Sequence, residues 1–254
     1  MIAVAVVGGA GRMGSLSAST VAEQDDLRLV AVIDPAFAPN TQTPAPTFAT
    51  VAEALENTAP RVAVEFSTPA SVFANTRALL EAGVHTVVGA TGLTAPQLEE
   101  LCELSRASGT GLLVAPNFSL GAALLMRFAR EAARYFQHAE IIELHHDGKV
   151  DAPSGTALHT ANLITAAEGG SILPPKVPSA SPARGLQTGP VTVHSVRLPG
   201  LVAHQEVLFG GTGELLTLRH DSLSRESFMA GVLLAIRAVP SLKEPVVGLE
   251  NILL

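Results

Sequence analysis

The sequence of 254 residues is long enough for one large domain or two smaller ones. Apolar residues make up 47% of the chain and charged residues 15%, which excludes disorder along most of its length. A net charge of -7 without a long basic run argues against nucleic acid as a partner. A small anionic ligand needs only a local positive pocket and stays possible.

A single cysteine excludes an internal disulfide and a zinc site built from cysteines, and we expect no metal. The N-terminal run MIAVAVVGG has no basic segment before its apolar residues, so it does not resemble a signal peptide. No apolar run approaches the roughly 20 residues that span a bilayer. The sequence therefore predicts a cytoplasmic protein without a membrane partner.

In the first half of the chain, valine-rich runs alternate with helical patterns. This alternation predicts parallel strands joined by right-handed crossovers, with ligands at the carboxyl ends of the strands. The predicted strands are 2–8, 27–34, 61–67, 85–91 and 110–116, and the predicted helices are 13–24, 50–58, 71–83 and 94–108.

A glycine-rich loop follows the first predicted strand. Gly9, Gly11 and Gly14 satisfy the pattern G-x-G-x-x-G and open a helix, where backbone amides and the helix dipole favour a pyrophosphate. Asp34 ends the second strand, 20 residues beyond Gly14, at the usual position of a ribose-binding carboxylate. These features predict a Rossmann domain that binds NADH. Arg12, inside the loop, could reach a 2′-phosphate, so NADPH stays open as well.

Three further strand ends carry polar or small residues, and in a doubly wound sheet such tips lie at one edge. Asn117 could bond a nicotinamide amide or hold a loop. The three tips are Ser67-Thr68-Pro69, Gly89-Ala90-Thr91-Gly92 and Ala115-Pro116-Asn117-Phe118.

Beyond residue 121 the pattern changes to strands at shorter spacing, which indicates a second α+β domain with a mixed or antiparallel sheet. A Pro/Ser-rich segment, 173–190, is expected to form a long exposed loop. The predicted strands here are 139–146, 191–198, 201–210 and 214–221, and the predicted helices are 123–136, 157–170 and 224–240.

The segment HHDGKVDAPSGTA, residues 145–157, concentrates groups that carry protons and charge. His145 and His146 close a strand, so their side chains should point to opposite faces, which argues against one shared metal. One of the two suits a proton donor, and Lys149 supplies a positive charge nearby. Ser154 is the expected cap of a helix whose first amides, at Gly155 and Thr156, would bind a carboxylate.

Four motifs, in this order, resemble those of the dihydrodipicolinate reductase family, which belongs to the diaminopimelate pathway of lysine biosynthesis. They are GGAGRMG, GATG, APNFSLG and ELHHDGKVDAPSGTAL. The resemblance covers nearly the whole chain. It implies a nucleotide-binding domain formed by residues 1–121 and 226–254. Residues 122–225 would then bind a dicarboxylate substrate and assemble a homotetramer.

The resemblance also implies roles for single residues, with NADH or NADPH as the cofactor. His145 would be the acid/base and Lys149 the proton donor, and the substrate would contact His146, Ser154, Gly155, Thr156 and Arg197. The nucleotide would contact Gly8, Gly9, Ala10, Gly11, Arg12, Met13, Asp34, Gly89, Ala90, Thr91, Ala115, Pro116, Asn117 and Phe118. Two positions depart from the family pattern: Gly148 replaces a frequent third histidine, and Ala90 replaces a common threonine.

Two alternatives stay open at the level of sequence. One is another amino-acid-pathway dehydrogenase of the aspartate or homoserine type, against which the 145–157 segment weighs. The other is a nucleotide-sensing protein that has lost its chemistry, which predicts loss of His145 or Lys149, although both are present.

Overall fold

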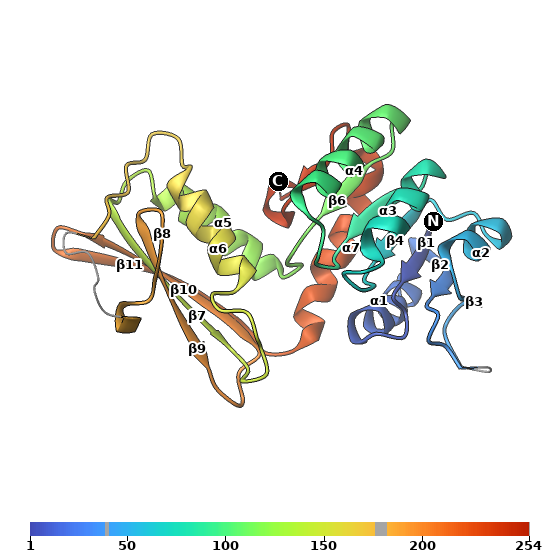
Figure 1. Ribbon diagram of the computed structural model, residues 1–254, viewed down its shortest axis with the longest axis horizontal. Helices are drawn as coiled ribbons and strands as arrows, with labels where there is room; N and C mark the ends of the chain where they lie inside the picture. Colours follow the sequence, from blue (N-terminus) through green and yellow to red (C-terminus); the bar gives the residue numbers. More distant parts are fainter. Residues whose placement is uncertain (39–40, 176–181, 254) are drawn as a thin grey trace. The chain divides into compact units, whose positions relative to one another are not determined.

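The computed structural model describes residues 1–38, 41–175 and 182–253 (Figure 1). The chain forms two compact units. The first unit comprises Met1–Phe118 and Phe228–Leu254, and the second comprises Ser119–Ser227.

The first unit is built on a seven-stranded sheet in which every strand pair is parallel. The order β3-β2-β1-β4-β5-β6-β12 contains the doubly wound order 3-2-1-4-5-6, so the predicted fold class is confirmed. Its strands are β1 (Ile2–Val7), β2 (Leu27–Ile33), β3 (Thr47–Phe48), β4 (Val62–Glu65), β5 (His85–Val88), β6 (Leu112–Val114) and β12 (Val246–Val247).

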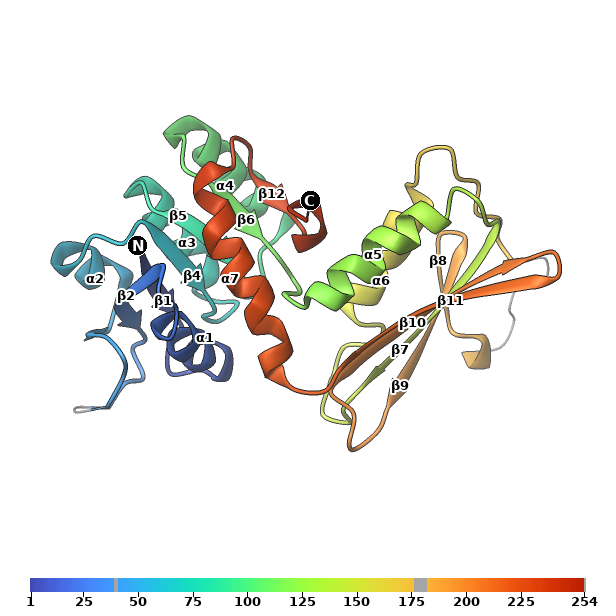
Figure 2. The same ribbon diagram turned by 180° about the vertical axis from the view of Figure 1, so that it is seen from behind.

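Helices cover both faces of this sheet because neighbouring strand residues point to opposite sides. Ala5 and Val7 of β1 pack against helices α2 and α3, whereas Val6 packs against Ala18 of α1. Figures 1 and 2 show the two faces, with α2, α3 and α4 on one and α1 and α7 on the other. The helices are α1 (Arg12–Ala22), α2 (Val51–Asn57), α3 (Val72–Glu81), α4 (Ala95–Ser108) and α7 (Met229–Ala238).

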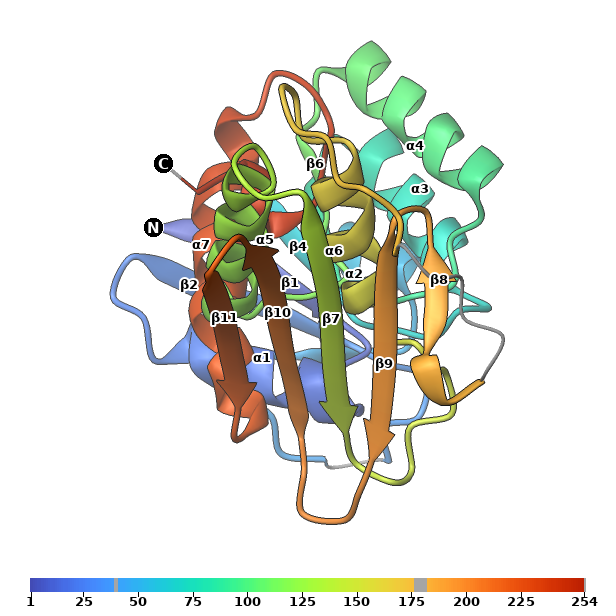
Figure 3. The ribbon, with the colours of Figure 1, turned by 90° about the vertical axis from the view of Figure 1, so that its left-hand side faces the viewer.

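The second unit is a mixed five-stranded sheet with two helices on one face, as Figure 3 shows. The helix-facing side of the sheet forms an apolar core around Ile141, Val193 and Phe209. The strand order is β11-β10-β7-β9-β8, and only the β7–β9 pair is parallel. The elements are α5 (Leu120–Ala132), β7 (His138–His145), α6 (Gly155–Thr165), β8 (Leu186–Thr188), β9 (Val191–Arg197), β10 (Ala203–Gly211) and β11 (Glu214–Ser222).

Differences from the predicted elements are concentrated in short segments. The expected long loop over 173–190 is wrong in its last part, where a 3-10 turn (Pro182–Arg184) and β8 form, while 176–181 lie outside the described residues. The two-residue strands β3 and β12 carry no period that a sequence pattern could reveal. The predicted helix 224–240 begins as a 3-10 turn, Arg225–Phe228, and becomes α-helical at Met229.

Within the described part of the chain, the helices are too short or too polar for any to cross a bilayer.

Candidate functional site

The glycine loop between β1 and α1 is shaped by close contacts that admit no side chain. Gly8 has a φ of +80°, and a Cβ there would lie 2.4 Å from the carbonyl oxygen of Phe66. A Cβ at Gly14 would lie 2.1 Å from Gly8 O, so this glycine lets α1 start directly against the strand. Gly11 differs, because its Cβ would meet only Gly8 O, at 3.2 Å, and would otherwise enter open space.

Helix α1 therefore begins with accessible backbone. Its N-cap residue, Gly11, supplies no side-chain cap, and Arg12 next to it is exposed. The first amide groups of a helix have no acceptor within the helix, and they favour an anion. A nucleotide pyrophosphate fits this end of α1, since Gly11 leaves room for its approach.

Asp34 is held at the tip of β2 by two backbone amides. Its Oδ2 accepts from the amide of Ala10 at 3.0 Å, and its Oδ1 accepts from the amide of Ala36 at 2.8 Å. The first bond ties the carboxylate directly to the glycine loop. Both oxygens retain further lone pairs, so the carboxylate can still accept hydrogen bonds from the hydroxyl groups of a ribose.

The tips of β4 and β6 pack through an aromatic pair beside Gly89, which follows β5. The Phe66 and Phe118 rings stand edge to face with their centroids 5.5 Å apart, and a Cβ at Gly89 would collide with both rings. Ala115 and Phe118 are buried, so any nucleotide contact at these two residues would use backbone atoms. Thr91 and Pro116 are exposed, and Ala90 and Asn117 are partly exposed.

One buried carboxyl group at this edge was not predicted from the sequence. Glu65, the last residue of β4, is fully buried, and burial raises the pKa of its carboxyl group. Its Oε1 accepts from the Ser67 amide at 3.2 Å and from Asn75 Nδ2 at 3.3 Å, whereas Oε2 has no partner among the described residues.

In the second unit, His145 ends β7 and contacts a buried carboxylate two residues earlier. Its Nδ1 lies 2.5 Å from Oε2 of Glu143, because side chains at i and i+2 share one face of a strand. Burial alone would raise the pKa of Glu143, but hydrogen bonds from His145, Arg197 and Ser195 lower it to about 2. Glu143 is therefore an anion inside the protein.

Arg197, the last residue of β9, provides the compensating charge. Its two terminal nitrogens lie 2.8 Å from the two Glu143 oxygens, a bidentate pair. The same guanidinium also donates to the carbonyl oxygens of Lys149, Asp151 and Val196. Arg197 thus ties the loop that carries Lys149 to the end of β7.

Lys149 lies in this loop and forms an ion pair with Asp151. Its Nζ is 2.7 and 2.8 Å from the two carboxylate oxygens, and the Lys149 hydrogen bond lowers the pKa of Asp151. The Asp151 side chain is 60% exposed, so a ligand can compete for the ammonium group. His146 and Gly148 are exposed in the same loop.

Ser154 is the N-cap of α6, as predicted. Its hydroxyl accepts from the Ala157 amide at 3.2 Å, and its own amide donates to Glu143 Oε1 at 3.1 Å. Gly155 is the first helical residue and is exposed. Glu143 therefore bonds both His145 and the start of α6, which brings the imidazole ring and the helix end together.

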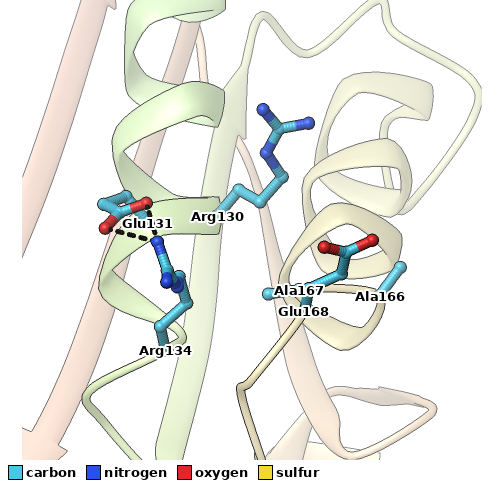
Figure 4. A pocket seen from close by; sticks show the side chains of 6 residues that line it. All are labelled: Arg130, Glu131, Arg134, Ala166, Ala167 and Glu168. Atoms are coloured by element: carbon cyan, nitrogen blue, oxygen red, sulfur yellow. Dashed lines mark hydrogen bonds and ion pairs between the residues drawn. The ribbon is translucent and has the colours of Figure 1, made fainter.

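A surface hollow of about 430 Å³ at the other end of α5 and α6 contains none of these residues (Figure 4). Glu131 and Arg134 pair within it at 3.0 Å. Its α6 side begins at Ala166, eleven residues beyond Gly155, or about 16 Å along a helix that rises 1.5 Å per residue. Among the described residues, no three His, Cys, Asp or Glu side chains group as metal ligands.

A doubly wound nucleotide-binding unit, joined to an α+β unit with a histidine–carboxylate pair beside a capped helix, is the architecture of a two-domain NAD(P)-dependent oxidoreductase. Two family models match: Dihydrodipicolinate reductase, N-terminus, over residues 2–118, and Dihydrodipicolinate reductase, C-terminus, over residues 121–253. The chain belongs to the dihydrodipicolinate reductase family.

Individual relatives support this membership over the full length. The 4-hydroxy-tetrahydrodipicolinate reductase of Listeria welshimeri is 47% identical, with 98% of this chain and 99% of the relative covered. That of Enterococcus faecalis is 48% identical, with 100% of both chains covered. A solved structure, dipicolinate-bound dihydrodipicolinate reductase from Paenisporosarcina sp. TG-14, is 43% identical and has a TM-score of 0.87, with 100% of both chains covered.

Proposed function

We propose that this chain reduces 4-hydroxy-tetrahydrodipicolinate to tetrahydrodipicolinate with NADH or NADPH, in the diaminopimelate route to lysine. The observation that carries the proposal is the cluster of His145, Lys149 and the N-terminus of α6. A histidine, a lysine and a helix N-terminus in one cluster would suit a proton carrier, a cation and an anion-binding site. The named activity of its full-length relatives agrees with that chemistry.

The first unit would hold the nucleotide, with residues 1–121 and 226–254 as the domain. The pyrophosphate would lie at the α1 end of the loop Gly8 to Met13, and Asp34 would accept from the ribose. We also assign nucleotide contacts to the Gly89-Ala90-Thr91 and Ala115-Pro116-Asn117-Phe118 tips. The nicotinamide supplies a hydride when the nucleotide is bound. Arg12 is exposed and could pair with a 2′-phosphate, so both nucleotides are candidates.

The second unit, residues 122–225, would bind the substrate through its carboxylates. One carboxylate would accept from the backbone amides at Gly155 and Thr156, where the Ser154 cap starts the helix. The other would pair with Lys149 in place of Asp151. His146 is exposed in the same loop and is assigned to the substrate as well. Dipicolinate, which occupies the Paenisporosarcina enzyme, is itself a ring dicarboxylate.

The reaction also needs one proton. The ring gains a hydride and a proton and loses its hydroxyl group as water, so the atoms balance when an acid on the protein delivers the proton. His145 is partly exposed at the end of β7 and holds its ring in place through Glu143. We assign the proton transfer to His145, with Lys149 as the neighbouring cation and proton donor.

We further propose that a second copy of this chain covers the open face of the second unit's sheet, and that four chains assemble. In the described part of this unit, helices cover only the other face (Figure 3). Half-exposed apolar side chains line the open face, among them Ile142 and Leu144 of β7 and Val196 of β9. Light scattering should give four times the 26.2 kDa chain mass, and Val196→Glu should lower it. A monomeric wild type would contradict this assembly.

The activity is tested by following NADH and NADPH absorbance with freshly condensed aspartate semialdehyde and pyruvate. Consumption with this mixture, and none with oxaloacetate plus ammonia, is expected. Consumption with oxaloacetate plus ammonia would instead indicate an aspartate-type dehydrogenase. Tight nucleotide binding without consumption of any substrate would indicate a nucleotide-sensing protein.

A further inference from the structure

Glu143 is the junction of the proposed substrate site. Its carboxylate is fully buried and accepts from four N–H groups on three segments: His145 of β7, two nitrogens of Arg197 on β9, and the Ser154 amide before α6. A buried carboxylate with this many donors stays ionised.

An ionised carboxylate can only accept hydrogen bonds, and this fixes the tautomer of the neighbouring ring. Nδ1 of His145 must carry a hydrogen to bond Glu143 Oε2, so the neutral ring has its lone pair on Nε2. Proton exchange with a ligand is thereby confined to Nε2. The ring is also held against rotation, which a proton donor needs if it is to meet one atom of the substrate.

Arg197 is fully engaged in the same support. A guanidinium has five N–H donors. Those of Arg197 reach both Glu143 oxygens and the carbonyl oxygens of Lys149, Val196 and Asp151. A direct bond from Arg197 to a substrate carboxylate would have to replace one of these five.

We propose that Glu143 is a positioning residue for the reduction: it orients His145 so that Nε2 delivers the proton, with Arg197 holding Glu143 rather than the substrate. This inference rests on the proposed function. It gives Arg197 a role different from the substrate contact that the family resemblance implies.

The test is steady-state kinetics of Glu143→Gln together with the Kd for dipicolinate. The amide oxygen of glutamine can still accept from Ser154, so we expect the dipicolinate Kd and the substrate KM to stay within about threefold of wild type. We expect kcat to fall about 10²-fold, because loss of an acid–base group typically costs about 10²- to 10⁴-fold. Glu143→Asp keeps the negative charge that pairs with Arg197, but its shorter side chain sets the carboxylate farther from His145. Its kcat should therefore lie between those of Glu143→Gln and wild type.

Glu140→Gln is the matched control. Glu140 lies on the same strand and bonds His194 Nε2 at 2.8 Å and Arg184 at 2.8 Å, but it faces the side of the sheet away from the helices. Because a second copy is proposed to cover this face, the variant is first checked for an unchanged elution volume. It should then keep kcat within about twofold of wild type, since the bonds of Glu140 lie on the opposite side of the sheet from His145.

The outcomes distinguish a failure of the proposed reductase activity from a failure of the positioning role of Glu143. An inactive wild type would remove the proposed function itself. If the wild type is active and Glu143→Gln keeps its kcat within threefold of wild type, only the positioning role is overturned. A dipicolinate Kd that rises as much as kcat falls would overturn that role as well. If Glu143→Gln does not fold, Glu143→Asp decides: a kcat at least tenfold below wild type with unchanged Kd supports the role, and a kcat within threefold overturns it.

Discussion

Lys149 and Asp151, two residues apart in one loop, form an ion pair in which Nζ lies 2.7 and 2.8 Å from the two carboxylate oxygens. The cation that the proposed reaction needs for a substrate carboxylate is therefore occupied by the protein's own carboxylate. Binding would exchange one carboxylate for another at the same ammonium group, with no net change in its number of charged neighbours.

Removing the competing carboxylate should tighten ligand binding. For Asp151→Asn we expect the dipicolinate Kd to fall by about 1.4- to fivefold, because an exposed pair is worth about 0.2–1 kcal/mol. Isothermal titration calorimetry measures this change. Asp147→Asn, which neutralises an exposed acid in the same loop, is the control and should leave Kd almost unchanged. Weaker binding by Asp151→Asn would show that Asp151 supports the site.

The two glycines of the loop should separate folding from nucleotide binding. Gly11→Ala places a methyl group at the open end of α1, so we expect NADH affinity to fall about tenfold with little change in Tm. Gly14→Ala should lower Tm clearly, because its methyl group would lie 2.1 Å from Gly8 O. Thermal melts and nucleotide titrations of both variants check this. Equal loss of Tm in both would remove the special role of Gly11.

Asp34 should set the preference between the two nucleotides. Asp34→Ala removes the acceptor for ribose hydroxyl groups and also a negative charge that would repel a 2′-phosphate. We expect the kcat/KM for NADH to fall at least tenfold relative to that for NADPH. The ratio of the two values in wild type and variant measures the effect, and an unchanged ratio would mean that another residue reads the ribose.

Glu143 should also make stability depend on acid pH. Its pKa is lowered from 4.5 to about 2 in the folded chain, so the contribution is present above pH 4.5 and is lost as the pH falls through about 2. At about 1.4 kcal/mol per pKa unit, the full contribution is about 3 kcal/mol. Urea titrations between pH 2 and 6 should show a shallower pH dependence for Glu143→Gln than for wild type. Identical slopes for the two proteins would contradict the buried anion.

Periodic features of the fold were predictable, whereas features set by tertiary contact were not. The parallel sheet and the Ser154 cap follow local rules, and both are present. The strand β8 has only three residues and forms because β9 lies beside it. A local sequence pattern does not indicate which strand it will pair with.

The candidate site shows the same division. His145 and Lys149 could be predicted because a histidine and a lysine ahead of a capped helix are unusual neighbours. In the sequence, Glu143 is one more polar position in an alternating strand. Its bond to Arg197, 54 residues away, shows that its carboxylate holds several parts of the candidate site together. The period-two spacing of Glu143 and His145 was the one signal in the sequence that could have indicated the pair.

The kcat of His145→Gln, measured beside its NADH Kd, tests the central claim most directly. We expect a turnover about 10²-fold or more below wild type with 4-hydroxy-tetrahydrodipicolinate. The NADH Kd should stay within about twofold of wild type, because His145 belongs to the second unit. A variant that turns over at the wild-type rate, or one that loses NADH affinity to the same extent as turnover, would contradict His145 as the proton carrier.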